Sequence, residues 1–277
     1  MTPGLGRSPE EGHFVDAAGI ATHYHEAGTG PPLVLVHGSG PGVSAYATWN
    51  RCIPALSRHH RVLAPDLIGF GLTERPCGQE YGRDAWLAHL EAFLDAVEAR
   101  PASLVGNSLG GALAIALAEG RRGSAQRLAL ISSPVVSFPV TDGLRTIWGY
   151  RPSLSHMRGV LETLACDKRL VTDEVVQSRY LASVEAGAYE AFATMFAPPY
   201  QRWVEAFAMP AERLAAMSQP VLIVHGREDR VVPVETAHRL ADLMPHAELL
   251  VLEGCGHWVP VERADELNDA LLRFLAR

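Results

Sequence analysis

A serine lies between two glycines in the sequence Gly106-Asn107-Ser108-Leu109-Gly110. A short apolar run precedes this G-x-S-x-G pattern, and a longer apolar stretch follows it. This context is typical of a sharp turn from a strand into a helix, where small flanking residues let the backbone fold tightly. Such a turn exposes the Ser108 hydroxyl at a helix N-terminus, where negative charge is stabilised. We therefore interpret Ser108 as a nucleophile rather than as a serine that only caps a buried helix.

A serine hydroxyl is a weak nucleophile at neutral pH and needs a base beside it. On this type of turn the acid and the histidine are expected to follow the serine in chain order. Asp229 and His257 both come directly after apolar runs in the C-terminal part of the chain. We expect His257 to act as general base and then general acid, with Asp229 orienting its imidazole and stabilising the imidazolium. Glu228 is the rival acid, although the shorter Asp229, followed by Arg-Val-Val-Pro, fits the usual loop better.

The oxygen that becomes negative on an attacked carbonyl needs at least two fixed hydrogen-bond donors. The backbone N–H of Leu109 is one candidate, because this residue directly follows the nucleophile. The second donor is expected from the segment His-Gly-Ser-Gly-Pro-Gly at 37–42, where glycines and a proline permit an unusual backbone. The N–H of Ser39 is the first choice, and its hydroxyl can add another donor. Gly38 and Gly40 are alternatives and are also expected to line the substrate site.

The other histidines and a nearby cysteine have simpler interpretations. His23 and His25 alternate with Thr and Tyr, and we expect them to form one exposed face of a strand. His37 and His225 end apolar runs and are expected to make structural hydrogen bonds around the site. Cys255 is interpreted as a small buried residue. No pair of histidines has metal-ligand spacing with a third acid or thiol nearby, so no metal site is predicted.

Length and charge restrict the class of protein. The chain has 277 residues, which corresponds to one or two domains. Its 24 basic and 31 acidic residues give a net charge of −7, which disfavours nucleic acid or an anionic membrane as the main partner. The four cysteines form no C-x-x-C pair, so no disulfide framework is indicated. Residues 1–13 lack the apolar core of a signal peptide, and the longest apolar stretch is too short to span a membrane. We expect a soluble, cytoplasmic protein.

Short apolar runs alternate with helical patterns along most of the chain, which predicts an α/β fold with a mostly parallel, doubly wound sheet. In such sheets ligands bind at the carboxyl ends of the strands, where the candidate residues lie. The expected strands are 20–26, 33–36, 61–65, 103–105, 128–131, 221–224 and 248–252. The expected helices between and after them are 47–57, 83–100, 109–121, 234–243 and 261–276.

Residues 134–210 interrupt this alternation with helical patterns and no convincing strand. Thr172 is a plausible N-cap of a helix over 173–186, with Gly187 as its end. Half of the aromatic residues of the chain lie in this segment. We interpret it as a helical cap inserted into a core domain formed by 1–133 and 211–277. Most of the aromatics are expected to pack the cap onto the core, and a few to line an apolar pocket.

Together these residues resemble the α/β-hydrolase superfamily over essentially the whole chain. Within it, the segments 37–45 and 106–111 and the Gly-His-Trp at 256–258 are similar to the meta-cleavage product hydrolases. The resemblance implies a serine hydrolase without a cofactor that cleaves a C–C bond in 2-hydroxy-6-oxo-hexa-2,4-dienoates, the products of extradiol cleavage of catechols. It implies a role in aromatic catabolism, a small-molecule substrate, and a homo-oligomer of two or more chains.

The resemblance also assigns residues to substrate binding. Arg179 matches an arginine of the family's cap and can direct its guanidinium at a carboxylate or an enol oxygen. From its helical position alone, a surface arginine is an equal alternative. Asn107 matches a residue that contacts the polar end of the dienoate, and Trp258 one beside the catalytic histidine. Two departures affect the substrate rather than the triad: Thr48 stands where many members have asparagine, and 259–262 differs from the usual sequence.

Two other functions remain open at the level of sequence. A carboxylesterase would use the same triad, and a ligand-binding receptor on this fold can retain it. Dehalogenase and epoxide hydrolase chemistry needs a carboxylate nucleophile, and a serine at position 108 excludes both. A polar pocket containing Arg179 and Asn107 favours the C–C hydrolase, whereas a wholly apolar pocket favours the esterase.

Overall fold

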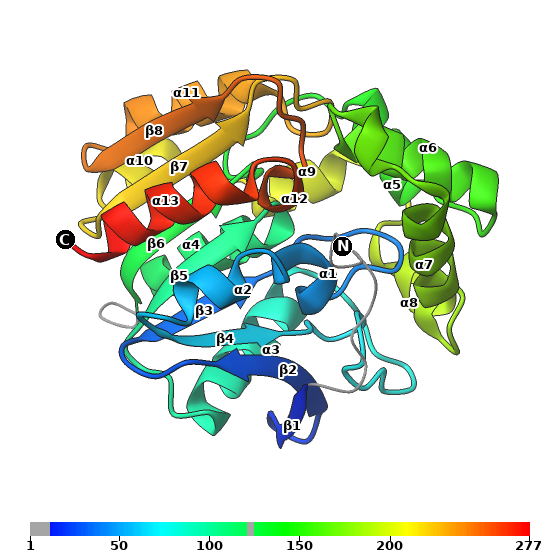
Figure 1. The fold of residues 1–277 in the computed structure, drawn as a ribbon, viewed down its shortest axis with the longest axis horizontal. Helices are drawn as coiled ribbons and strands as arrows, with labels where there is room; N and C mark the ends of the chain where they lie inside the picture. Colours follow the sequence, from blue (N-terminus) through cyan, green and yellow to red (C-terminus); the bar gives the residue numbers. More distant parts are fainter. Residues whose placement is uncertain (1–11, 121–124) are drawn as a thin grey trace.

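The computed structural model describes residues 12–120 and 125–277. The expectations for most of the 1–13 segment and for the last residue of the 109–121 helix fall outside these ranges. Within them, eight strands form one sheet in the order β1-β2-β4-β3-β5-β6-β7-β8 (Figure 1). The strands are β1 (His13–Asp16), β2 (Ala21–Ala27), β3 (Pro32–Val36), β4 (Arg61–Pro65), β5 (Ala102–Asn107), β6 (Ala125–Ile131), β7 (Val221–Gly226) and β8 (Ala247–Leu252).

The sheet is parallel from β4 through β8, whereas β1 pairs antiparallel with β2, and β2 pairs antiparallel with β4. The predicted mostly parallel α/β fold is therefore confirmed. Strands β5 and β7 are buried along their whole length, which explains why they are continuous apolar runs rather than alternating ones. Strand β1 was not predicted, because its four residues, His-Phe-Val-Asp, are too few for a periodic pattern.

Helices cover both faces of the sheet and divide its core in two. The buried apolar side chains form two clusters, one for each face of the sheet. Helices α3, α4 and α11 contribute to one cluster, and α1, α2, α12 and α13 contribute to the other. Among the described helices, none reaches the length and hydrophobicity that crossing a membrane requires. The helices of the two faces are α1 (Ala45–Trp49), α2 (Ile53–Leu56), α3 (Arg83–Ala96), α4 (Leu109–Gly120), α11 (Val234–Leu243), α12 (Val259–Glu262) and α13 (Ala264–Leu275).

Two predicted helices are each split in the structure. The helix expected at 47–57 is broken between α1 and α2, where Pro54 occupies the first turn of α2. A proline cannot continue a preceding helix, because its ring clashes with the carbonyl four residues earlier. The helix expected at 261–276 is divided into α12 and α13 at Arg263, whose φ of −131° and ψ of 44° are not helical.

Only helices connect β6 to β7 among the described residues, and α6, α7 and α8 project beyond the sheet at the right of Figure 1. Thr172 caps α7 as expected, since its side chain accepts from the N–H of Val175. The helix ends earlier than predicted, at Ser183, and Gly187 (φ 78°) begins α8 instead of ending α7. The division into core and cap at 134 and 210 stays a prediction. The connecting helices are α5 (Asp142–Trp148), α6 (Leu154–Leu164), η1 (Lys168–Leu170), α7 (Asp173–Ser183), α8 (Ala188–Met195), α9 (Gln201–Phe207) and α10 (Ala211–Ala215).

The expected exposed face of β2 was wrong. His23 is 1% exposed and His25 is 7% exposed, because β1 and β4 flank β2 and the chain after β4 covers it. The Nδ1–H of His23 donates to Oδ2 of Asp66 at 2.8 Å. Asp66 also accepts from the backbone N–H groups of Ala45 at 2.6 Å and Leu72 at 2.9 Å. One buried carboxylate thus joins β2, the end of β4 and the start of α1.

These contacts keep Asp66 ionised although it is buried. Burial by itself would raise the pKa of the Asp66 carboxyl, but the hydrogen bonds from His23 and from the N–H of Ala45 lower it below its ordinary value. A carboxyl with a lowered folded-state pKa stabilises the fold above the unfolded pKa of about 3.9, and this contribution is lost as the pH falls through the folded value.

We predict that Asp66→Asn destabilises the protein by about 3–5 kcal/mol at pH 7. An NH₂ group in place of Oδ2 would face the two donors that now bind this oxygen, and the buried pair with His23 would be lost. Urea denaturation followed by circular dichroism measures this loss. Asp84→Asn is the matched control, since the Asp84 side chain is 96% exposed. Equal midpoints for the two variants at pH 7, or a difference that does not shrink on acidification below about pH 4, would contradict the prediction.

Candidate active site

Ser108 lies in the turn between β5 and α4, with a φ of 53°. This left-handed conformation is unfavourable for a serine and is held by surrounding contacts. The Ser108 N–H donates to the carbonyl of Ile131 at 2.8 Å. A Cβ on Gly106 would overlap the backbone of Gly110, and a Cβ on Gly110 would overlap the carbonyl oxygen of Val36. The two glycines of the motif are therefore required by backbone-to-backbone packing.

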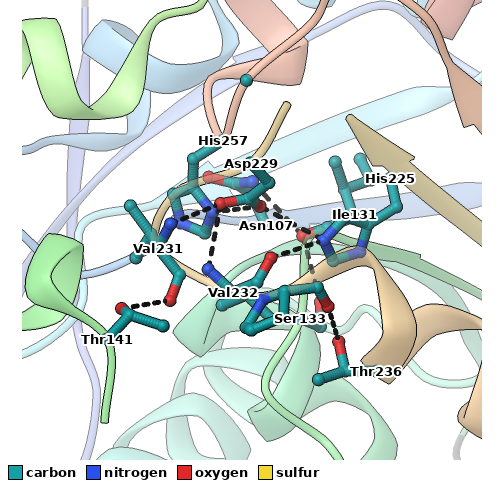
Figure 2. A network of polar contacts seen from close by, with 12 residues as sticks. Asn107, Ile131, Ser133, Thr141, His225, Asp229, Val231, Val232, Thr236 and His257 are labelled. Atoms are coloured by element: carbon teal, nitrogen blue, oxygen red, sulfur yellow. Dashed lines mark hydrogen bonds and ion pairs between the residues drawn. The ribbon is translucent and has the colours of Figure 1, made fainter. Parts of the chain in front are cut away.

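His257 and Asp229 form a hydrogen-bonded pair on neighbouring loops (Figure 2). The Nδ1 of His257 lies 2.7 Å from Oδ2 of Asp229. The other carboxylate oxygen accepts from the N–H groups of Val231 at 2.8 Å and Val232 at 2.9 Å. With Nδ1–H donated to the carboxylate, Nε2 is the nitrogen that can accept a proton. The rival acid, Glu228, instead accepts from the N–H of Cys255 at 2.9 Å.

Asp229 is held in its charged form inside the protein, where its side chain is 0% exposed. Burial alone would raise the pKa of the Asp229 carboxyl, whereas the neighbouring His257 and His225 lower it well below its ordinary value. The carboxylate therefore remains ionised at neutral pH and can stabilise a positive charge on the His257 ring.

The structural hydrogen bonds expected of His37 and His225 are confirmed. The Nδ1 of His37 lies 2.7 Å from the carbonyl oxygen of Gly38, and its Nε2 accepts from the N–H of Leu67 at 2.9 Å. Burial lowers the pKa of His37, so this ring is neutral and donates through Nδ1. The Nε2 of His225 lies 2.9 Å from the carbonyl oxygen of Val232. Cys255 is fully buried, as expected.

The glycine-containing segment after β3 lies directly against the serine turn. A Cβ on Gly38 would stand 3.0 Å from the Cβ of Ser108. Ser39 lines the same cavity as Ser108 and Leu109. Since α4 begins at Leu109, the N–H of this residue has no acceptor within the helix. The structure thus brings both proposed oxyanion donors to one cavity, while Gly40 lines a second cavity instead.

An apolar cavity of about 320 Å³ adjoins Ser108. Trp148 and Phe207 are the aromatic residues of the segment 134–210 that line it, whereas Phe196 lies behind Trp148, stacked on it with ring centroids 4.9 Å apart. Sequence periodicity could not make this distinction, because the short helices α5 and α9 present their faces according to tertiary packing. The remaining apolar lining residues are Pro134, Leu144, Val204 and Val232.

Arg179 is buried in α7 and is 5% exposed, so the alternative of a surface arginine was wrong. Its Nε and Nη1 have no hydrogen-bond partner among the described residues, and its guanidinium carbon lies 5.9 Å from the ring centroid of Trp258. Burial lowers the pKa of Arg179 to about 10, which leaves it charged at neutral pH. A buried cation without a counter-ion is unfavourable, and this one lines a cavity of about 610 Å³.

The other residues assigned to substrate binding have different surroundings. The Asn107 amide donates to the carbonyl of Ile131 at 3.3 Å, next to the serine turn. The backbone N–H of Trp258 donates to the carbonyl of Leu164 at the end of α6. The Thr48 hydroxyl donates to the carbonyl of Ser44 at 3.0 Å, and Thr48 is not among the residues that line either cavity. Its part in substrate binding stays a prediction.

Glu262 makes contacts next to the site that the sequence did not reveal. Its Oε1 accepts from the N–H of Gly256 at 2.8 Å, and its Oε2 accepts from the N–H groups of Cys166 at 2.7 Å and Asp167 at 2.9 Å. One carboxylate therefore ties the loop that carries His257 to the segment after α6. The only signal in the sequence was an acid five residues after the histidine, which many loops contain.

Within residues 12–120 and 125–277, no group of three or more His, Cys, Asp or Glu side chains is arranged to hold a metal ion. The polar groups described above are suited to acyl-transfer chemistry, in which a serine attacks a carbonyl and fixed N–H groups stabilise the oxyanion.

Comparison with known proteins places these features in a family. A profile of the alpha/beta hydrolase family matches residues 33–270. The chain is 50% identical over 267 residues to a 2-hydroxy-6-oxo-2,4-heptadienoate hydrolase of Pseudomonas putida F1, covering 96% of this chain and 97% of that one. It is 46% identical over 269 residues to a 2-hydroxymuconate semialdehyde hydrolase of Pseudomonas sp. CF600, covering 97% and 95%.

A solved structure shows the same similarity in three dimensions. A meta-cleavage product hydrolase from Pseudomonas fluorescens IP01, in a variant with a serine replaced by alanine and complexed with acetates, superposes with a TM-score of 0.95. The two chains are 45% identical, and the match covers 97% of this chain and 99% of the other.

We predict that Gly110→Ala abolishes most of the activity and lowers the melting temperature, because the added methyl group forces α4 away from the end of β3. Gly120→Ala is the matched control in the same helix, since a Cβ at Gly120 has no neighbour within 4 Å. It should leave activity unchanged and stabilise the protein by up to about 1 kcal/mol. Activity assays and thermal melts compare the two, and equal behaviour would refute the packing argument.

Proposed function

This chain belongs to the alpha/beta hydrolase family, and we propose that it is a serine hydrolase that cleaves a C–C bond in a 2-hydroxy-6-oxo-hexa-2,4-dienoate-type compound. The observation that carries the substrate class is the buried, unpartnered cation of Arg179. A dienoate brings a carboxylate and an enol oxygen that can complete its hydrogen bonds. The similar hydrolases named above, which act on compounds of this class, support the same assignment.

The two cavities suit the two ends of such a substrate. The cavity that contains Arg179 would receive the carboxylate end, and the apolar cavity beside Ser108 would receive the substituent on C6. This orientation places the C6 carbonyl near Ser108, where the N–H groups of Leu109 and Ser39 can stabilise its oxygen.

The reaction requires two proton movements before the bond breaks. The enol loses its hydroxyl proton and gains one at C5, which gives a ketone at C2. His257 then takes the hydroxyl proton of Ser108 as the Ser108 oxygen bonds to C6. When the C5–C6 bond breaks, its electron pair is delocalised toward the C2 oxygen, and the imidazolium returns a proton to the departing fragment. The products are 2-hydroxypentadienoate and an acyl group on Ser108, which water releases as a carboxylic acid.

A carboxylesterase is the second candidate, favoured by the apolar lining of the cavity beside Ser108. It would use the same serine, base and oxyanion donors. It gives no reason, however, for a buried cation at the other end of the site. A receptor with a retained triad is the third candidate, and turnover distinguishes it from the two enzymes.

The proposal also covers the location, the assembly and the metabolic role of the protein. We place it in the cytoplasm as a homo-oligomer of two or more chains, acting in the catabolism of aromatic compounds. The apolar side chains of Leu181, in the last turn of α7, and Val184, the C-cap residue of this helix, support self-association, because they lie three residues apart and are 55% and 39% exposed.

We predict that Ser108→Ala lowers kcat for a yellow 2-hydroxy-6-oxo-dienoate about 10⁴-fold or more, because the nucleophile is lost while the fold is kept. The loss of dienoate absorbance measures turnover, and a short-chain p-nitrophenyl ester is assayed in parallel. Fast Ser108-dependent bleaching with slower ester cleavage is expected. Ester cleavage alone would instead identify an esterase, and tight binding of a dienoate that is never cleaved would identify a receptor.

We predict that Arg179→Met lowers kcat/KM for the dienoate about 10- to 100-fold, the effect of one charge-assisted hydrogen bond, and affects the ester little. Its melting temperature should be equal to or above that of the wild type, since an uncompensated buried charge is removed. Arg169→Met is the matched control, because the Arg169 side chain is 90% exposed. An equal loss on both substrates would show that Arg179 does not recognise the dienoate.

A further inference from the structure

Asp229 has a second histidine beside it in addition to His257. The Nε2 of His225, at the end of β7, lies 3.2 Å from Oδ2 of Asp229, the oxygen that also receives the Nδ1–H of His257 (Figure 2). The His225 and Asp229 side chains are 1% and 0% exposed. Because both side chains are buried, water does not screen their electrostatic interaction, which therefore acts at the low effective dielectric of the protein interior.

The partner of His225 fixes which of its nitrogens carries the proton. Nε2 lies 2.9 Å from the carbonyl oxygen of Val232, and a carbonyl oxygen can only accept a hydrogen bond. Nε2 therefore bears the hydrogen. The N–H bond is directed at Val232, and its positive end also lies close to Oδ2 of Asp229.

Val232 connects the two side chains through its own peptide groups. Its N–H donates to Oδ1 of Asp229 at 2.9 Å, and its carbonyl accepts from His225. His225 thereby holds the turn that supplies donors to the carboxylate. Val232 also lines the cavity beside Ser108, so the same contact positions one wall of the site.

The N–H of His225 competes with His257 for the charge on Oδ2. An oxygen that already faces one donor is a weaker acceptor for a second, so the imidazolium form of His257 is stabilised less. The titratable groups facing Asp229 are His225 from β7 and, from the loop after β8, His257 and Cys255. Burial raises the pKa of the Cys255 thiol, and Glu228 is engaged with the Cys255 N–H. His225 is thus the group that can adjust the carboxylate.

We infer that His225 is a positioning residue of the reaction: it holds the Asp229–Val232 turn and limits how strongly Asp229 stabilises the protonated form of His257. The inference rests on the proposed function only in taking His257 as the base. It applies to C–C cleavage and to ester cleavage alike, because both use the same proton transfer.

The test compares His225→Leu with His225→Gln, whose amide can donate from the position of Nε2. His225→Leu should lower kcat/KM about 10-fold, as expected for the loss of one buried hydrogen bond, and should move the midpoint of the acidic limb of kcat/KM upward by about half a pH unit. The glutamine should restore most of both. His238→Leu, on the exposed side of α11, is the matched control and should change neither.

The pH profile separates positioning from a merely structural role. A lower kcat/KM with an unchanged midpoint, a midpoint that moves downward, or a wild-type profile would each overturn the inference. If leucine at position 225 prevents folding, His225→Asn replaces it, since the shorter amide keeps the site polar without reaching Val232.

A measurement without substrate distinguishes failure of this inference from failure of the proposed function. The proton between Nδ1 of His257 and Asp229 is observable by NMR in the resting protein. It should move downfield in His225→Leu, because the bond to Asp229 strengthens, and return in His225→Gln. This holds even if the dienoate is not a substrate, and an unchanged resonance in His225→Leu would overturn the inference.

Discussion

The contact between the serine turn and the backbone at the end of β3 is the constraint on which the site depends. Gly110 leaves no room for a side chain against the carbonyl of Val36, and Gly111 leaves none against the hydroxyl of Ser133. The resulting approach places Gly38 beside Ser108, with a φ of 53° at the serine. The proposed nucleophile and the proposed oxyanion donors are thereby fixed together, because neither segment can shift without displacing the other.

Two buried charges in the same site are treated differently by the protein. Asp229 receives donors from His257, Val231 and Val232, so its charge is stabilised before any ligand arrives. Arg179 has a guanidinium whose Nε and Nη1 lack hydrogen-bond partners among the described residues and whose carbon lies 5.9 Å from the ring centroid of Trp258. A buried charge whose hydrogen bonds are formed within the protein is stable without a ligand. A buried charge that lacks hydrogen-bond partners gains most from a ligand that supplies the missing acceptors.

Polar contacts at one junction hold the connecting helices to the catalytic loop. Glu262 accepts from the backbone N–H groups of Gly256, in the His257 loop, and Cys166, after α6. The backbone N–H of Trp258 donates to the carbonyl of Leu164 at the end of α6. The loop that carries His257 is therefore fixed both by Asp229 and by the helices that enclose the cavities. Movement of those helices would displace the His257 loop directly, because Gly256 packs closely against the carbonyl oxygen of Leu164.

The sequence alone predicted the parallel α/β fold and favoured Asp229 over Glu228 as the partner of His257. Apolar runs mark buried strands, and loops after parallel strands necessarily meet at one edge of the sheet. It did not determine the burial of His23, the break at Pro54 between α1 and α2, or the end of α7 at Ser183. These depend on which neighbours cover each face, and local periodicity carries no such information.

Only the tertiary structure decided that Arg179 is buried, with Nε and Nη1 lacking hydrogen-bond partners among the described residues. It also decided that Trp148 and Phe207 rather than Phe196 line the apolar cavity, and that His225 contacts Asp229. The first two of these facts join segments far apart in the chain, whereas His225 and Asp229 are only four residues apart and are brought together by the loop after β7. Spacing along the sequence fixes the direction of a side chain only within its own helix or strand, whereas its partners come from elements that other parts of the chain bring alongside.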